Sequence, residues 1–149
     1  MNDKDVSDLA REPAGYWTGV AHEAGIAYIN VEHRKLGVTQ RHWMTFNALA
    51  RSAGGLTRAE VGDELRQYFT PQIGAFDTYP AVLDDLADRG YVETDGQERL
   101  RLTESGLAKR AEIAARTPAI RGHLHEGIDD ADYATTVTVL RRLVANATR

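Results

Sequence analysis

Histidines and carboxylates are the side chains of this sequence that could hold a metal ion or move a proton. His123, His125 and Glu126 are close in sequence, but two histidines two residues apart do not share a helix face. Neither His22 nor His125, each followed by glutamate, has a second histidine at the fifth position, so the zinc-protease helix motif is absent. We therefore expect surface or core histidines, no metal and no cofactor.

Nucleophilic and redox chemistry have no support either. The chain has no cysteine, which excludes disulfides, thiolate nucleophiles and thiol redox sensing. No serine lies in a nucleophile elbow, and Gly54-Gly55 is read as the end of a helix rather than as a phosphate loop. The carboxylate pair Asp129-Asp130 stands at a predicted helix start, where capping explains it. We predict that the protein is not an enzyme.

Composition indicates a globular domain. The 149 residues are 42% hydrophobic and 27% charged, with a net charge of −4. No apolar run approaches the ~20 residues that span a bilayer, and the polar start is unlike a secretory signal, so we expect a soluble cytoplasmic protein. Residues 56–102 hold 5 basic and 10 acidic side chains, which argues against a protein that coats itself in nucleic acid.

Three amphipathic helices are predicted in the first part of the chain. Pro13 opens the first, over 13–36, after a loose polar lead. Thr39 caps the second helix, and Thr57 with Glu60 forms the capping box of the third. The apolar stripe of the first helix repeats every three or four residues: Tyr16, Val20, Ala24, Ala27 and Val31.

A fourth helix and a hairpin follow. Asp77 can cap this helix, with Pro80 in its first turn. Its inner face is predicted to hold Val82, Leu83, Leu86 and Ala87. Residues 91–93 and 99–102 then alternate in polarity on either side of Asp95-Gly96, a strong hairpin signal.

Long helices close the chain. Thr103 caps one beginning at Glu104, and Pro118 either kinks this helix or starts a new one with Thr117 as cap. Asp129 caps the last helix, whose apolar stripe consists of Tyr133, Val137, Leu140 and Val144. The predicted fold is mainly α with a small two-stranded wing, a winged helix-turn-helix flanked by terminal helices. A small centre cannot cover both terminal stripes, which favours a second copy in two-fold symmetry.

The order and spacing of several motifs resemble the MarR family of bacterial winged-helix transcriptional regulators, over about residues 16–147. The motifs are Leu56-Thr57-Arg58-Ala59-Glu60-Val61, the run from Leu83 to Val92, Leu102-Thr103-Glu104-Ser105-Gly106, and the closing stretch from Gly127 to Leu143. The resemblance implies one regulator domain over 1–149. Residues 39–102 would be its DNA-binding part, and 13–36 and 104–147 its dimerisation helices.

Two departures from the family pattern concern the DNA-binding part. The segment between Leu65 and Asp77 is longer than the family's tight turn. The wing is short, and Thr94–Arg99 offers one basic residue near its tip.

The DNA-binding predictions follow from these positions. A recognition helix presents its first turn to base edges, here Thr78, Tyr79 and Ala81. The alternative is that Tyr79 packs in the core and Thr78 solvates the turn. Phosphate contacts are predicted for Arg58, Arg99 and Arg101, and the alternative is that they are plain surface arginines.

The resemblance also implies a small aromatic ligand in a cleft between the dimerisation helices and the DNA-binding part. We predict Tyr16, Trp17 and Trp43 as ligand-binding residues, with core packing as the alternative. The dimer is predicted to use Val20, Tyr133, Val137, Leu140 and Val144.

The sequence thus predicts a homodimeric DNA-binding transcriptional regulator that acts on a pseudo-palindromic operator and is released by a small aromatic effector. The alternative is a winged-helix dimer with weak or no DNA binding that serves as a protein-interaction module, which the acidic centre would suit.

Overall fold

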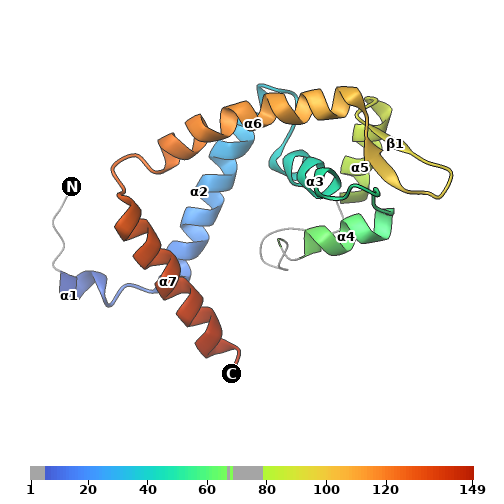
Figure 1. Ribbon diagram of the computed structural model, residues 1–149. Coiled ribbons are helices and arrows are strands. Elements are labelled where there is room, and N and C mark those ends of the chain that lie inside the picture. Colours follow the sequence, from blue (N-terminus) through green and yellow to red (C-terminus); the bar gives the residue numbers. More distant parts are fainter. Residues whose placement is uncertain (1–5, 67, 69–78) are drawn as a thin grey trace. The chain divides into compact units, whose positions relative to one another are not determined.

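The structure is a computed structural model that describes residues 6–66, 68 and 79–149. These residues belong to two compact units, Met1–Ala115 and Arg116–Arg149, whose boundary falls within a helix. None of the helices in the described ranges is both long and apolar enough to cross a membrane. The elements, labelled in Figure 1, are α1 (Val6–Leu9), α2 (Ala14–Arg34), α3 (Gln40–Arg51), α4 (Arg58–Arg66), α5 (Tyr79–Asp88), β1 (Val92–Thr94), β2 (Leu100–Leu102), α6 (Glu104–Leu124) and α7 (Asp130–Ala147). The predicted mainly α fold with a two-stranded wing is confirmed.

Short-range capping fixes where several helices begin. The Thr57 N–H donates to Glu60 Oε2 at 2.8 Å, and the Glu60 N–H donates to Thr57 Oγ1 at 3.2 Å. This is the predicted capping box at the start of α4. Thr103 Oγ1 accepts from the Gly106 N–H at 3.0 Å, and Asp129 Oδ1 accepts from the Asp132 N–H at 2.7 Å, so the predicted caps of α6 and α7 are confirmed.

Two predictions near the chain ends need correction. The lead before Pro13 is not wholly irregular, because α1 occupies Val6–Leu9. The structure has one continuous α6 with Pro118 inside it. The alternative of a new helix capped by Thr117 is therefore wrong.

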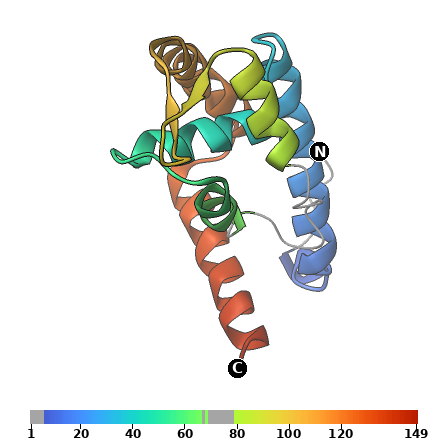
Figure 2. The same cartoon turned by 90° about the vertical axis from the view of Figure 1, so that its right-hand side faces the viewer.

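The core lies in the first unit, where α3 packs against α4, α5 and β2 (Figure 1 and Figure 2). The largest fully buried apolar side chains are Phe46, Leu65, Leu83, Leu86, Ile113, Val38 and Val61. Burial of each of the larger ones contributes about 1.5–3 kcal/mol. Ala87 was predicted on the inner face of α5 but is exposed, so this face is narrower than the pattern indicated.

The wing is an antiparallel pair in which Val92 lies opposite Leu102 and Thr94 opposite Leu100. Leu56 adds one more bridge to Leu100, with backbone hydrogen bonds of 3.1 and 2.7 Å. The residue with positive φ in the loop is Glu98, at 59°. The wing's base is therefore attached to the segment before α4.

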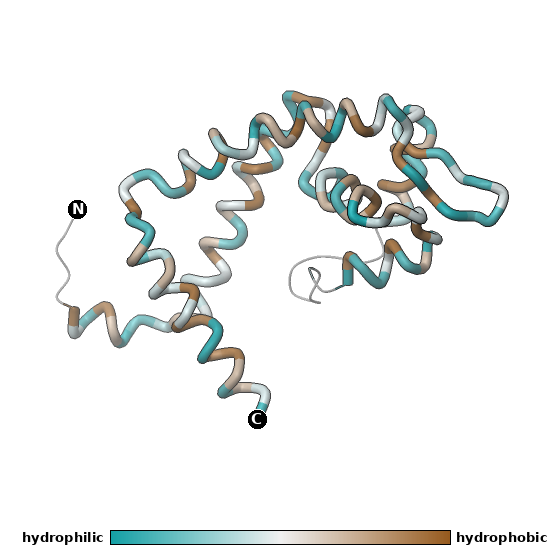
Figure 3. The backbone as a smooth tube through the Cα atoms, in the orientation of Figure 1, coloured by the Kyte–Doolittle hydropathy of each residue, from teal (hydrophilic) through white to brown (hydrophobic). Residues whose placement is uncertain are grey.

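The predicted stripes of the terminal helices are apolar, and most of their side chains are exposed in the part of the chain that the structure describes. On α2, Tyr16 is 61% exposed and Val20 38%. On α7, Tyr133 is 39% and Val144 64% exposed, and only Leu140 of the predicted stripe is partly buried. Figure 3 shows apolar positions recurring along both helices. Each of the two units thus has an exposed apolar helix face among its described residues.

Candidate nucleic-acid interface

The second helix of the helix-turn-helix is α5, which follows α4 and stands at the position predicted for a recognition helix. Three of its side chains enter the core: Val82, Leu83 and Leu86. Ala81 is exposed as the major-groove prediction requires, and Pro80 lies in the first turn as expected. The other exposed side chains of this face include Asp84 and Asp88. Asp77, the predicted cap of this helix, and Thr78 lie outside the described residues.

Tyr79 is partly buried and packs against the core. A Cβ at Gly62 of α4 would lie only 2.8 Å from the Tyr79 hydroxyl oxygen. Because Gly62 has no side chain, the Tyr79 ring can pack against α4 at this point. Tyr79 therefore packs in the core, which was the alternative to DNA contact given for it. Contact of its hydroxyl with a base stays a prediction.

Arg58 joins the two helices of the motif. Its Nη2 donates to Asp84 Oδ1 at 2.7 Å, and both side chains are at least half exposed. Such a surface pair contributes about 0–1 kcal/mol. The guanidinium predicted to contact phosphate is thus neutralised by a carboxylate of the recognition helix.

Arg99 is held by backbone and carboxylate oxygens at the start of the wing. It donates to the carbonyls of Gly54 at 3.0 Å and Gly55 at 2.8 Å, and to Glu60 Oε2 at 3.1 Å. The Thr57 N–H is the main cause that lowers the pKa of Glu60, so this carboxylate stays charged opposite Arg99. Gly55 has a φ of 75°, which glycine adopts at little cost.

Arg101 lies on the same side of the wing as Arg99, as its position two residues on predicts. Its Nη2 lies 3.4 Å from Asp95 Oδ2 and donates to the Gly54 carbonyl at 3.2 Å. The backbone N–H groups of Arg99 and Gln97 hold the pKa of Asp95 below its usual value. Both wing arginines thus stabilise the chain itself, and their contact with phosphate stays a prediction.

A second cluster, which the sequence did not reveal, joins α3 to the middle of α5. His42 Nδ1 accepts from the Thr39 N–H at 3.2 Å, so Nε2 carries the proton and donates to Asp85 Oδ2 at 3.0 Å. Arg89 donates to the same carboxylate at 3.0 Å and to the Gly37 carbonyl at 2.9 Å. Burial raises the pKa of Asp85, but the hydrogen bonds from Arg89 and His42 outweigh it and leave the pKa lowered.

His33, at the end of α2, is 2% exposed, and its Nδ1 has no hydrogen-bond partner among the residues that the structure describes. Burial lowers its pKa, partly offset by a hydrogen bond to the Thr39 backbone. The prediction of core or surface histidines therefore includes one core histidine that is kept neutral.

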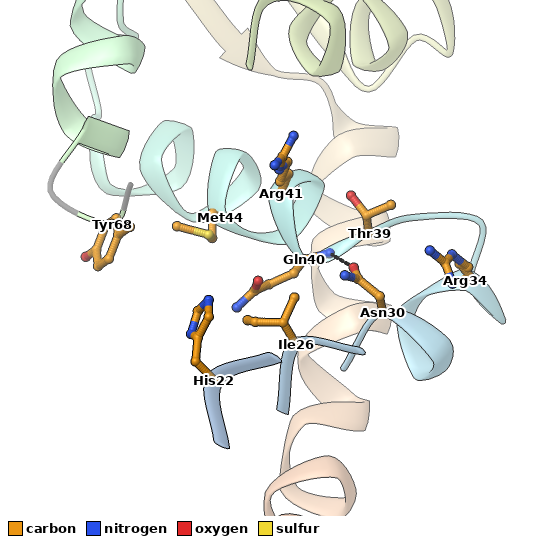
Figure 4. A pocket seen from close by; sticks show the side chains of 9 residues that line it. All are labelled: His22, Ile26, Asn30, Arg34, Thr39, Gln40, Arg41, Met44 and Tyr68. Carbon is orange, nitrogen blue, oxygen red and sulfur yellow. Dashed lines mark hydrogen bonds between the residues drawn. The ribbon is translucent and has the colours of Figure 1, made fainter. Parts of the chain in front are cut away.

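An open cavity of about 410 Å³ lies between α2 and α3, and we call it the inter-helix cavity (Figure 4). Its walls combine apolar groups with cationic and amide groups: Ile26, Met44, Tyr68, His22, Gln40 and Arg41 among them. The Gln40 N–H donates to Asn30 Oδ1 at 2.9 Å across the two helices. A pocket of this size suits a small organic molecule.

The three aromatic residues predicted for a ligand lie apart from this cavity's lining. Tyr16 and Trp17 contact each other edge to face, with ring centroids 5.3 Å apart, and are 61% and 50% exposed. Trp43 packs against the core, stacks under Arg110 at 5.9 Å and lines a neighbouring 280 Å³ pocket. Ligand contact by these rings stays a prediction.

Among the residues that the structure describes, no cluster of three histidine, aspartate or glutamate side chains could hold a metal ion.

Sequence comparison finds no matching family model and no matching curated protein. Solved structures match in fold. Reduced MarR from Escherichia coli is 20% identical with a TM-score of 0.71, over 91% of this chain and 98% of that one. A MarR family protein from Mycobacterium tuberculosis in complex with DNA is 20% identical with a TM-score of 0.67, over 89% and 98%.

A third match is CouR from Rhodococcus jostii RHA1 bound to p-coumaroyl-CoA, which is 19% identical with a TM-score of 0.69, over 89% of this chain and 91% of that one. The three matches cover nearly the whole length of these proteins. The chain therefore has the winged-helix fold of the MarR transcriptional regulators.

Proposed function

We propose that this chain is a homodimeric transcriptional regulator that binds a pseudo-palindromic DNA operator and releases it when a small aromatic ligand binds. The observation that carries the proposal is the helix-turn-helix with its wing, in a fold shared with a neighbour in complex with DNA. Ala81 is exposed in the first turn of α5, where such motifs meet base edges.

The uncovered apolar faces of α2 and α7 support the dimer. Large apolar side chains exposed on them include Tyr16, Trp17, Val137 and Val144. A stable homodimer of this kind buries on the order of 2,000 Å² or more. Light scattering at micromolar concentration should give about twice the chain mass of 16.5 kDa.

Substitution of Leu140 and Val144 by aspartate should turn the dimer into a monomer, because each would bury an unpaired charge. Arg141→Asp and Arg142→Asp, on exposed positions of the same helix, provide a control for added acidic charge. A monomeric unmodified chain would contradict the proposal.

Duplex binding is tested by selection from a random-sequence pool followed by fluorescence anisotropy. Two recognition helices about 34–36 Å apart occupy successive major grooves, so the selected sites should be inverted repeats. Tyr79→Ala and Ala81→Ser should change the selected bases. A chain that retains no duplex at 50 mM salt would contradict the proposal.

The inter-helix cavity is the best-supported place for the effector. Because Arg34 and Arg41 are among the residues that line the cavity, an aromatic acid fits better than a neutral ring. Trp17 and Trp43, the chain's two tryptophans, report binding through indole fluorescence. Each quenching ligand is then tested for operator release, and Met44→Glu should abolish both effects by placing a like charge in the cavity.

One observation favours the second candidate function, a protein-interaction module. All three arginines predicted to hold phosphate already pair with carboxylates or carbonyls, and α5 presents exposed aspartates. If the dimer forms but no duplex is selected, this function replaces the first.

A further inference from the structure

The inter-helix cavity adjoins a second pocket along α3. This pocket of about 280 Å³, which we call the side pocket, is lined by Trp43, Asn47 and Arg51 together with Gln40, Met44 and Tyr68. Gln40, Met44 and Tyr68 also line the inter-helix cavity. The two pockets therefore meet at a shared wall, and we call the pair the α3 groove.

Helix α3 sets the length of this groove. Gln40, Met44, Asn47 and Arg51 follow one another at intervals of four, three and four residues, so they lie along one face of the helix. A rise of ~1.5 Å per residue places Gln40 and Asn47 about 10 Å apart along the helix axis. A single ring that carries an acid group fills only one of the two pockets, so a ligand that occupies both must be elongated.

The end of the α3 groove at the inter-helix cavity is cationic. Arg34 and Arg41 line this end, and guanidinium groups bind carboxylates through charge-assisted hydrogen bonds. Figure 4 shows the Gln40 side chain extending into the space between Met44 and His22, where its amide adds a further hydrogen-bond donor. This end of the groove is therefore suited to an acid group.

The end at the side pocket is aromatic. Arg110 holds two of its walls in place, because it stacks on the Trp43 ring at 5.9 Å and donates to Asn47 Oδ1 at 3.0 Å. Arg51 is exposed here and pairs with Glu64 at 3.6 Å, so its charge is already balanced. An uncharged ring packed against Trp43 suits this end better than a second acid group.

We propose that the α3 groove binds an elongated arylalkanoic acid, with its carboxylate beside Arg34 and Arg41 and its ring in the side pocket against Trp43. This inference rests on the proposed aromatic effector and narrows its class to acids in which an alkyl chain separates the carboxylate from the ring. It also separates the residues predicted to bind the ligand, because Trp43 contacts the ring whereas Tyr16 and Trp17 do not.

The first test compares phenylacetate, 4-phenylbutyrate and the neutral 4-phenylbutyramide by calorimetric titration of the full chain. Burial of each added methylene group raises affinity about threefold, so 4-phenylbutyrate should bind about tenfold more tightly than phenylacetate. The amide lacks the charge that Arg34 and Arg41 would pair with, and it should bind about tenfold more weakly than 4-phenylbutyrate.

The second test locates the ring. The change in indole emission caused by 4-phenylbutyrate should persist in Trp17→Phe and disappear in Trp43→Phe. Asn47→Phe, which fills the side pocket, should abolish the tenfold gain while phenylacetate still binds as before. Ala50→Phe is the matched control, because Ala50 is exposed on the same helix and lines neither pocket. Thermal unfolding checks that each variant is folded, and if Asn47→Phe is not, the emission of Trp43→Phe decides.

Equal affinities for phenylacetate and 4-phenylbutyrate would overturn this inference alone, as would an emission change that persists in Trp43→Phe. Absence of binding by both acids would overturn the proposed aromatic effector together with this inference. Duplex selection tests the proposed DNA binding independently of either result.

Discussion

The wing and the turn between α2 and α3 use arginine in opposite ways. Arg99 and Arg101 donate to carbonyls and carboxylates of their own chain, whereas Arg34 at the turn has no such ion pair among the described residues. An arginine's position in a DNA-binding motif therefore does not by itself show that it contacts DNA, because its guanidinium can instead be bound by carbonyls and carboxylates of its own chain.

The largest expected effect is on the wing. Arg99→Ala removes hydrogen bonds to two backbone carbonyls and to Glu60. Charge-assisted hydrogen bonds contribute about 1.5–3 kcal/mol, so the free energy of unfolding should fall by about 2 kcal/mol in urea denaturation. Arg101→Ala, with a more exposed side chain, should cost less. Unchanged stability of Arg99→Ala would mean that the wing does not depend on this residue.

A similar but smaller effect is expected where α4 meets α5. Gly62→Ala places a methyl group against the Tyr79 ring, and overpacking of this kind costs about 1–2 kcal/mol. The double variant Gly62→Ala with Tyr79→Leu should cost less than the two single changes added together. Additive costs in the same urea measurements would show that the two residues do not contact each other.

Asp84→Asn would break the ion pair between Arg58 and Asp84. The Arg58 guanidinium would then be available to DNA, unlike the wing arginines. Loss of a negative charge from α5 and release of a guanidinium should raise duplex affinity about three- to tenfold, or roughly 0.7–1.4 kcal/mol. Asp88→Asn, which removes a charge of the same helix without freeing Arg58, should raise it less. Equal gains in duplex affinity from both variants would indicate that the loss of negative charge alone raises the affinity, without a contribution from Arg58.

The smallest expected effect is on how the free energy of unfolding depends on pH. His33 at the end of α2 and the carboxylates of the wing region should act in different pH ranges. Burial lowers the pKa of His33, so the unfolded chain binds a proton more readily. Stability due to His33 is complete above the unfolded value of about 6.5 and is lost as the pH falls below it. The lowered pKa values of Glu60 and Asp95 leave the wing contacts intact until the pH falls below about 4. Unfolding from pH 7.5 to 5.5 should depend less on pH in His33→Gln, and an unaltered profile would exclude His33 as the cause.

The helix order, three of the caps and the hairpin were predictable because their signals are local. The hydrogen bonds of Thr57 with Glu60 and of Thr103 with Gly106 span three residues. The bonds of Arg99 span 39 to 45 residues, so they depend on how α4 meets the wing, which periodicity does not encode. The sequence did not predict His42 as a capping residue, because the third position of a capping box is usually glutamate or glutamine.

Amphipathic patterns identified the terminal stripes correctly but could not identify what covers them. Val20 and Val144 have the helical spacing of core residues, yet they are 38% and 64% exposed in the chain. Periodicity reports that a face is apolar, and only the packing of the chain shows whether its own elements reach that face.

The central claim is that two copies of this fold bind one duplex, with the α5 helix of each copy in the major groove. Phosphate-ethylation interference on the selected inverted repeat tests it most directly. The account predicts two clusters of interfering phosphates about 10–10.5 base pairs apart, related by the symmetry of the repeat. A single cluster, or no interference at all, would contradict the account.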